Sequence, residues 1–94
     1  MKVSLIIPCY NEEGNVRPLY DEVVRTFEGA VSDYEFVFVN DGSADRTPEV
    51  LNELVASADR PVKAVHFSRN YGKESAILAG LEEASGDCFT IMDG

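Results

Sequence analysis

Hydrophobic residues along the chain follow two alternating patterns, short apolar runs and longer stretches with helical spacing. Residues 2–9 (KVSLIIPC) form the first run, and its Val and Ile side chains with the closing Pro8 predict a buried strand. From Asn15 onward apolar residues recur at intervals of three and four, which predicts an amphipathic helix with Asn15 as N-cap and Gly29 as stop signal. Its apolar stripe consists of Val16, Leu19, Tyr20, Val23, Val24 and Phe27.

A second strand and helix follow in the same order. Residues 34–39 (YEFVFV) are aromatic and β-branched, and they end at the turn-forming residues Asn40, Asp41, Gly42 and Ser43. The next helix is predicted to begin at Asp45 or Thr47, with Pro48 at its first position. Its inward side is predicted to carry Val50, Leu51, Leu54, Val55 and Ala58.

The last third of the chain repeats the alternation once more. Residues 62–67 predict a third strand, and a helix is predicted from Gly72 or Lys73 to Ala84. The inward side of that helix would consist of Ala76, Ile77, Gly80, Leu81 and Ala84. Residues 88–92 predict a fourth strand, and their apolar composition predicts that this strand is buried.

Strands that alternate with helices imply a parallel sheet with right-handed crossovers. We therefore predict an α/β fold over residues 1–94, a Rossmann-like βαβαβαβ unit with helices on both faces of a mainly parallel four-stranded sheet. In the strand order 3-2-1-4, the order reverses between the first and fourth strands, and a ligand crevice opens outside their carboxyl ends. The loops expected to converge there are residues 8–14, 40–45, 68–72 and 93–94.

Composition excludes several classes of function. A formal net charge of −9 provides no basic patch, so we expect no nucleic-acid partner. No run approaches the roughly 18 apolar residues of a membrane-spanning helix, and Pro8 interrupts the only candidate for a signal-peptide core. Cys9 closes the first strand and Cys88 opens the fourth, so we expect two unpaired thiols and a cytoplasmic location.

Polar residues cluster after every predicted strand. They are Asn11, Glu12 and Glu13, then Asn40 and Asp41, then Arg69 and Asn70, and finally Asp93. Each alone could be a cap, a turn residue or a surface charge. Because all four groups meet at one edge of the sheet, the cluster predicts a ligand site.

The kind of ligand can be narrowed by exclusion. The loop after the first strand, PCYNEEGN, lacks the GxGxxG pattern of dinucleotide-binding folds. Gly72 and Lys73 do not belong to a P-loop, because Phe67 and Glu74 occupy the positions of its first glycine and its Ser or Thr. The site offers carboxylates instead, which suit a divalent cation between a protein and a diphosphate, or hydrogen bonds to a nucleobase and a ribose.

Four segments, SLIIPCYNEEGN, FVFVNDGSADRT, FSRNYGKE and IMDG, together resemble a known family. They resemble the N-terminal, nucleotide-binding half of glycosyltransferase family 2, the inverting enzymes of GT-A fold. The tract FSRNYGKESAILAGL is most similar to the branch that makes dolichyl-phosphate or polyprenyl-phosphate sugars. The resemblance covers the whole chain.

The resemblance assigns roles to residues that match its motifs. It implies that Pro8, Tyr10 and Glu12 line the base and ribose of a nucleotide-diphosphate sugar of UDP or GDP type. It also implies that Asp41 hydrogen-bonds the base while Gly42 and Ser43 shape its turn. Arg69 and Lys73 would lie in a loop beside the nucleotide, Lys73 near the phosphates or base. Asp93 would be the first aspartate of the DxD motif, in contact with the ribose and a bound Mg²⁺ or Mn²⁺.

The same resemblance implies a reaction, direct displacement at the anomeric carbon with inversion. The second DxD aspartate would follow Gly94, and no residue of residues 1–94 matches the catalytic base. We therefore expect these 94 residues to bind the donor without turning it over. The parent enzyme is expected to act at the cytoplasmic face of a membrane on a lipid-phosphate acceptor.

Two other functions stay open from the sequence, a non-catalytic α/β interaction or nucleotide-binding module and another nucleotide-sugar enzyme such as a nucleotidylyltransferase. The second is disfavoured because residues 8–14 contain no Arg or Lys. The fourth strand is expected to expose an apolar edge, which invites pairing with another copy of the chain. We therefore predict a homo-oligomer that forms through this edge.

Overall fold

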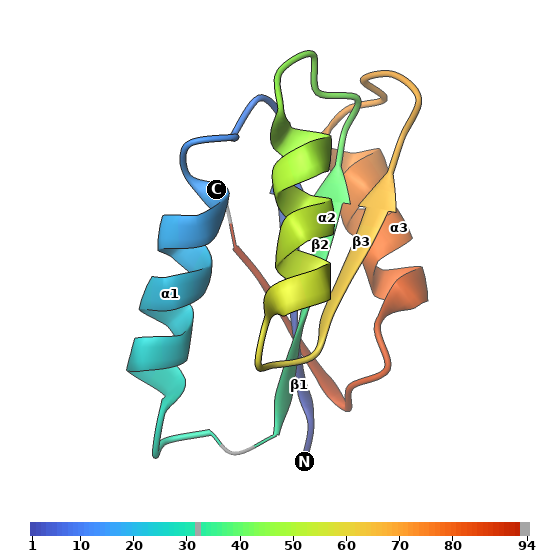
Figure 1. The fold of residues 1–94 in the computed structure, drawn as a ribbon. Helices are drawn as coiled ribbons and strands as arrows, with labels where there is room; N and C mark the ends of the chain where they lie inside the picture. Colours follow the sequence, from blue (N-terminus) through green and yellow to red (C-terminus); the bar gives the residue numbers. More distant parts are fainter. Residues whose placement is uncertain (32, 93–94) are drawn as a thin grey trace.

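A computed structural model describes residues 1–31 and 33–92. Strands and helices alternate along the chain, as the apolar pattern predicts (Figure 1). The elements are β1 Val3–Cys9, α1 Val16–Phe27, β2 Tyr34–Asn40, α2 Thr47–Ser57, β3 Val62–His66, α3 Lys73–Glu83 and β4 Cys88–Ile91. Each lies within two residues of its predicted bounds.

The four strands form one parallel sheet in the order β3-β2-β1-β4. Figure 1 shows α1 and α2 on one face of this sheet and α3 on the other. The predicted α/β class, strand order and two-sided helix cover are therefore confirmed. Because the strands are parallel, the carboxyl ends of β1 and β2 lie at the same edge of the sheet, where the loops of the predicted site meet.

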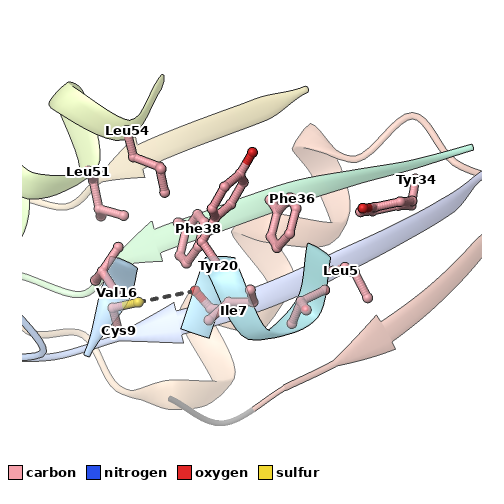
Figure 2. Packing of buried hydrophobic residues seen from close by; sticks show 11 residues of the cluster. Leu5, Ile7, Cys9, Val16, Tyr20, Tyr34, Phe36, Phe38, Leu51 and Leu54 are labelled. Carbon is pink, nitrogen blue, oxygen red and sulfur yellow. Dashed lines mark hydrogen bonds between the residues drawn. The ribbon is translucent and has the colours of Figure 1, made fainter. Parts of the chain in front are cut away.

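The main core lies between the sheet and the helices α1 and α2. Figure 2 shows side chains of β1 and β2 pointing toward residues of these helices. Aromatic rings fill its centre: Tyr20 packs on Phe36 with ring centroids 4.8 Å apart, and Phe36 stacks on Phe38 at 5.9 Å. Such contacts add about 0.5–1.5 kcal/mol each to the gain from burial, so this face holds the strand ends in place.

The opposite face of the sheet packs against α3. Gly80 allows the close approach of this helix, because a Cβ atom there would lie 2.5 Å from Cγ2 of Ile6 and 3.3 Å from Cγ2 of Val39. Ala76 is also buried in this layer. The predicted inward side of α3 is thus correct for Ala76 and Gly80. The other three predicted residues, Ile77, Leu81 and Ala84, are only partly buried.

Three details differ from the sequence predictions. The predicted burial of the fourth strand is wrong, because Phe89 and Ile91 are each 50% exposed on β4, the last strand of the sheet. Val55 was predicted to face inward from α2 but is 44% exposed. The side chain of Asn15 does not cap α1; its amide instead donates to Glu12 Oε2 at 2.7 Å.

The start of α2 differs slightly from the prediction. Arg46 occupies the N-cap position in place of Asp45 or Thr47, and Asp45 Oδ1 accepts a hydrogen bond of 2.9 Å from the backbone N–H of Thr47, the first residue of the helix. Both cysteines are free, as predicted. Cys88 pairs in register with Val3, at the opposite end of β1 from Cys9, which is why the thiols lie apart.

A buried carboxylate interrupts the apolar pattern of β2. Glu35 is fully buried on the α3 side, where Oε2 accepts hydrogen bonds of 2.7 Å from Ser4 Oγ and from the backbone N–H of Ser85. Its Oε1 lies 3.2 Å from Nζ of Lys63. Burial raises the pKa of Glu35, but the hydrogen bonds from Ser85 and Ser4 and the Lys63 ammonium outweigh burial and lower the pKa to about 2. This cluster joins β1, β2, β3 and the loop before β4 at the amino end of the sheet.

Candidate functional site

The loops after β1, β2 and β3 meet at the carboxyl edge of the sheet. The strand register places Cys9 beside Asn40, and Asn40 beside His66, so the three strands end at the same level. The backbone N–H of Asp41 then donates to the carbonyl of Cys9 at 2.8 Å, which extends the β1–β2 pairing into the turn. Residues that follow these strands are therefore held close together, as the predicted strand order requires.

Asp41 connects two of the loops at this edge of the sheet. Its carboxylate is buried, and Oδ1 accepts a hydrogen bond of 2.7 Å from the backbone N–H of Tyr71. Oδ2 accepts a second one of 3.1 Å from Gly72. A carboxylate has about four acceptor positions, so Asp41 can fix the 69–72 loop and still accept hydrogen bonds from a ligand.

Gly42 makes the approach of two loops possible. Its φ of 69° lies in the left-handed region that glycine adopts at little cost. A Cβ atom at this position would clash with the backbone of Arg69 and Asn70. The turn predicted around Gly42 therefore requires glycine for a second reason besides its φ angle. The 69–72 loop occupies the space that a side chain would need.

A pocket of about 130 Å³ opens beside Asp41. It is lined by Pro8, Cys9, Tyr10, Asp41 and Lys73. Four of the nine residues predicted for the site are thus brought together, from three separate loops. The pocket is smaller than the 300–1,000 Å³ of most small-molecule sites, so it can enclose one ring or a similar part of a larger ligand.

Cys9 is the lining residue that the sequence did not predict. Burial, with a smaller contribution from the charge of Glu12, raises the pKa of the Cys9 thiol to about 12. Its Sγ is directed at the carbonyl of Ile7, 3.6 Å away (Figure 2). Because the thiolate is the reactive form, this thiol is an inert part of the wall and not a nucleophile.

Three predicted residues lie outside the pocket lining and make structural contacts. Glu12 accepts from Asn15 through its side chain, and its backbone N–H donates to Thr47 Oγ1 at 2.9 Å. Ser43 Oγ accepts from the backbone N–H of Asn11 at 2.9 Å. The guanidinium of Arg69 lies 4.7 Å from the ring centre of Tyr71. Their assigned contacts with a nucleotide stay predictions.

Comparison with known proteins identifies the family. The sequence model described as "Glycosyl transferase family 2" matches residues 4–94. The chain belongs to glycosyl transferase family 2. It is 45% identical over 94 residues to the Prophage bactoprenol glucosyl transferase homolog of Escherichia coli, covering 99% of the chain and 30% of that protein. It is 44% identical over 93 residues to the Dolichol-phosphate mannosyltransferase of Pyrococcus furiosus, covering 99% of the chain and 25% of that protein.

Solved structures of similar fold agree with this assignment. The mannosyltransferase PcManGT from Pyrobaculum calidifontis, in complex with GDP-Man and Mn²⁺, superimposes with a TM-score of 0.85 at 26% identity, over 97% of this chain and 26% of that one. S. aureus TarS 1-349 shares the fold with a TM-score of 0.82 at 24% identity, over 99% of this chain and 27% of that one. The chain spans about a quarter to a third of the length of the relatives it matches.

The PcManGT structure contains Mn²⁺, so the described residues are of interest as possible ligands of a divalent cation. Residues 1–31 and 33–92 contain no group of three or more His, Cys, Asp or Glu side chains placed to hold a metal ion. Asp93, to which the family resemblance assigns the metal, lies outside the described residues. The described side chains therefore do not form a metal centre by themselves.

The structure gives Asn11, a member of the predicted polar cluster, a contact that the sequence did not predict, and it places Tyr71 beside this family 2 site without a predicted role. Asn11 adopts a φ of 54°, and its Oδ1 accepts a hydrogen bond of 2.8 Å from the backbone N–H of Ala44. It thereby joins the loop after β1 to the turn after β2. Tyr71 is half-exposed beside the site and packs edge-to-face on Phe67. Asparagine tolerates left-handed conformations. The position of Asn11, two residues after the first strand, was therefore the feature of the sequence that could have indicated this turn.

Proposed function

We propose that this chain is the donor-binding part of an inverting family 2 glycosyltransferase. Its ligand would be a nucleotide-diphosphate sugar of UDP or GDP type. The observation that carries the proposal is the pocket at the carboxyl ends of β1 and β2, where the carboxylate of Asp41 and the side chain of Lys73 line the same space. In open α/β sheets, ligands bind outside the carboxyl ends of the strands.

The lining residues suit the parts of such a ligand. Asp41 has acceptor positions left for a nucleobase N–H or a hydroxyl group. Pro8 and Tyr10 provide an apolar wall and an aromatic ring against which a planar base can pack. Lys73 carries a positive charge at the first residue of α3, where phosphate oxygens would be favoured.

The acceptor proposed for the whole enzyme is a polyprenyl phosphate, dolichyl phosphate included. This rests on the relatives named for bactoprenol and dolichol phosphate. A phosphate acceptor is already anionic, so it would attack the anomeric carbon without a protein base. The leaving nucleotide diphosphate would depart from the opposite side, which inverts the configuration.

A divalent cation, Mg²⁺ or Mn²⁺, is proposed as cofactor of the whole enzyme, with Asp93 among its ligands. Support comes from the Mn²⁺ in PcManGT. When bound, such an ion neutralises the charge that develops on the leaving diphosphate.

We also propose a location at the cytoplasmic side of a membrane, where nucleotide sugars and the head groups of lipid phosphates can meet. No helix in residues 1–31 and 33–92 has the length and apolar content to cross a bilayer.

Calorimetry on the 94-residue chain tests the proposal. UDP, GDP, UDP-glucose and GDP-mannose would each be titrated with and without Mn²⁺. We expect binding of one base class with a dissociation constant in the high micromolar to millimolar range, because a pocket of this size encloses only part of the ligand. Absence of a signal with every nucleotide, from a chain shown to be folded by circular dichroism, would overturn the proposal and favour a non-catalytic interaction module.

Assembly through β4 is proposed separately. β4 is the last strand of the sheet, so one of its edges has no partner strand in the described part of the chain. Phe89 and Ile91 add exposed apolar surface at this edge. A second copy of the chain could pair there with β4, which would satisfy the free backbone groups and cover both side chains.

A further inference from the structure

We propose that His66 is a positioning residue of the donor pocket, which it holds in its binding form through a neutral imidazole ring. The inference rests on the proposed function, since it concerns the affinity of the same pocket for a nucleotide. His66 does not line the pocket. It acts through Asn40, the residue that directly precedes Asp41.

The contacts of His66 connect three elements. Its Nδ1 lies 3.2 Å from Nδ2 of Asn40, at the end of β2. Its Nε2 lies 3.0 Å from Oδ1 of Asn52, on α2. Asn40 is buried, and its other side-chain atom, Oδ1, accepts a hydrogen bond of 3.0 Å from the backbone N–H of Ser43. The side chain of Asn40 is therefore held between the ring and the turn that follows β2.

These contacts fix the protonation state of the ring. Since the Ser43 N–H needs an acceptor, the amide oxygen of Asn40 points to Ser43 and its NH₂ group points to His66. Nδ1 must then accept and carry no proton. Nε2 carries the proton and donates it to Asn52 Oδ1. The network is complete only with the neutral Nε2–H tautomer.

The chain of hydrogen bonds continues to the pocket. Ser43 Oγ accepts from the backbone N–H of Asn11, and Asn11 Oδ1 accepts from Ala44. Asn11 follows Tyr10, which lines the pocket. Asp41, on the other side, follows Asn40 in the chain. Both walls of the pocket thus depend on the turn that the Asn40 side chain holds.

Protonation of His66 would break this arrangement. With a proton on both nitrogens, the ring faces the NH₂ group of Asn40 with a donor. Rotation of the Asn40 amide by 180° would supply an acceptor to the ring, but it would remove the acceptor from the Ser43 N–H. One hydrogen bond is lost in either case. Because the binding form needs the neutral ring, nucleotide affinity should fall on acidification.

Charged groups near His66 do not replace the lost contact. Glu49 and Glu53 are exposed residues of α2 next to Asn52 in the helix, and neither forms an ion pair with His66 in the described part of the chain. Lys63 points to the other face of the sheet, where it pairs with Glu35. Asp41 directs its carboxylate to Tyr71 and Gly72.

The first test compares nucleotide affinity between pH 5 and 8 in three proteins, using UDP and GDP as probes. In the wild type we expect a three- to tenfold loss of affinity on acidification. His66→Leu, which removes the acceptor, should bind weakly at every pH. His66→Asn places an uncharged acceptor near the position of Nδ1, so it should restore part of the affinity and remove the pH dependence that the wild type shows beyond the titration of the nucleotide itself. An equal pH dependence in the wild type and His66→Asn would overturn the inference.

A second measurement separates this inference from the proposed function. Two-dimensional NMR of the ligand-free chain should show the Ser43 backbone amide and the Asn40 side-chain amide shifting with the same midpoint as the His66 ring. This outcome would support the positioning role even if no nucleotide bound at any pH, a result that would overturn only the proposed function. Amides of Ser43 and Asn40 that do not follow the ring would overturn the positioning role, whatever the nucleotide affinity.

Discussion

The carboxylate of Asp41 accepts a hydrogen bond of 2.7 Å from the backbone N–H of Tyr71, thirty residues further along the chain. Together with the bond from Gly72, this contact fixes the 69–72 loop against the turn after β2. A side chain assigned to ligand recognition by family resemblance is therefore also a structural anchor of its own pocket.

Asp41→Asn should disturb both roles. The amide has one oxygen acceptor in place of two, so one of the two backbone N–H groups would face a donor. Hydrogen bonds to charged groups contribute about 1.5–3 kcal/mol, so we expect a tenfold or greater loss of nucleotide affinity. Amide hydrogen exchange at Tyr71 and Gly72 should become faster. Asp21→Asn, at an exposed position of α1, is the matched control and should change neither. Slow exchange and full affinity in Asp41→Asn would contradict the anchoring role.

Gly42→Ala should be far more damaging than Gly29→Ala. Both glycines have positive φ, 69° and 81°, so alanine would cost about 1–2 kcal/mol at either site from backbone conformation alone. Only at Gly42 would the new Cβ clash with another segment, the backbone of Arg69 and Asn70; around Gly29 the space is open. We expect a loss of about 3 kcal/mol or more for Gly42→Ala, measured by urea unfolding. Equal losses for the two variants would show that the loops can separate without cost.

Glu35→Gln should lower stability in a pH-dependent way. The folded-state pKa of about 2 lies below the value of about 4.3 for an unfolded glutamate, so the stabilisation is fully present above about pH 4.3 and is lost as the pH falls toward 2. We expect Glu35→Gln to lower the free energy of unfolding by about 1–3 kcal/mol at pH 7, or the melting temperature by about 4–8 °C per kcal/mol.

The difference in melting temperature between the wild type and Glu35→Gln should shrink when both are measured at pH 2–3. Glu82→Gln, at an exposed position of α3, serves as control and should differ little from the wild type at either pH. A difference of constant size across this range would mean that the charge of Glu35 does not contribute to stability.

Ile91→Lys should prevent the proposed assembly through β4. A charge at a half-exposed position of the edge strand would face the second copy, and lysine at sheet edges opposes strand pairing. We expect light scattering to give the mass of a dimer or higher oligomer for the wild type and of a monomer for Ile91→Lys. Leu78→Lys changes an exposed apolar residue on α3, away from this edge, and should leave the mass unchanged. A monomeric wild type at working concentration would exclude the assembly.

The apolar pattern was sufficient to predict the sheet because each element carries its own periodicity. Residues 2–9 could be recognised as a strand from their neighbours alone, and the alternation of strands and helices then restricted the topology to a parallel sheet. The same reasoning failed for β4, since Phe89 and Ile91 are as apolar as buried residues but are half-exposed on the last strand of the sheet. Local composition does not record which strand lies at the edge.

The site could be predicted in part for a related reason. Asp41 and Lys73 follow strand or loop boundaries that the pattern marks, and both line the pocket. Glu35 is bonded to Ser4, 31 positions earlier, and to Ser85, 50 positions later. Asn40 contacts His66, 26 positions later, besides the nearby Ser43. Hydrogen bonds of this range leave no periodic signal, so neither the role of His66 nor the burial of Glu35 could be read from the sequence.

The strand order has a consequence for the time at which the protein can fold during synthesis. β1 is made first but lies in the interior of the sheet, and its second neighbour is β4, whose Cys88 pairs with Val3. One edge of β1 therefore stays without its partner until residues 88–91 have left the ribosome. Contacts so distant in sequence form slowly, and an unpaired apolar strand is prone to wrong associations in the meantime. A nascent chain of this kind would depend on chaperones chiefly at its oldest segment.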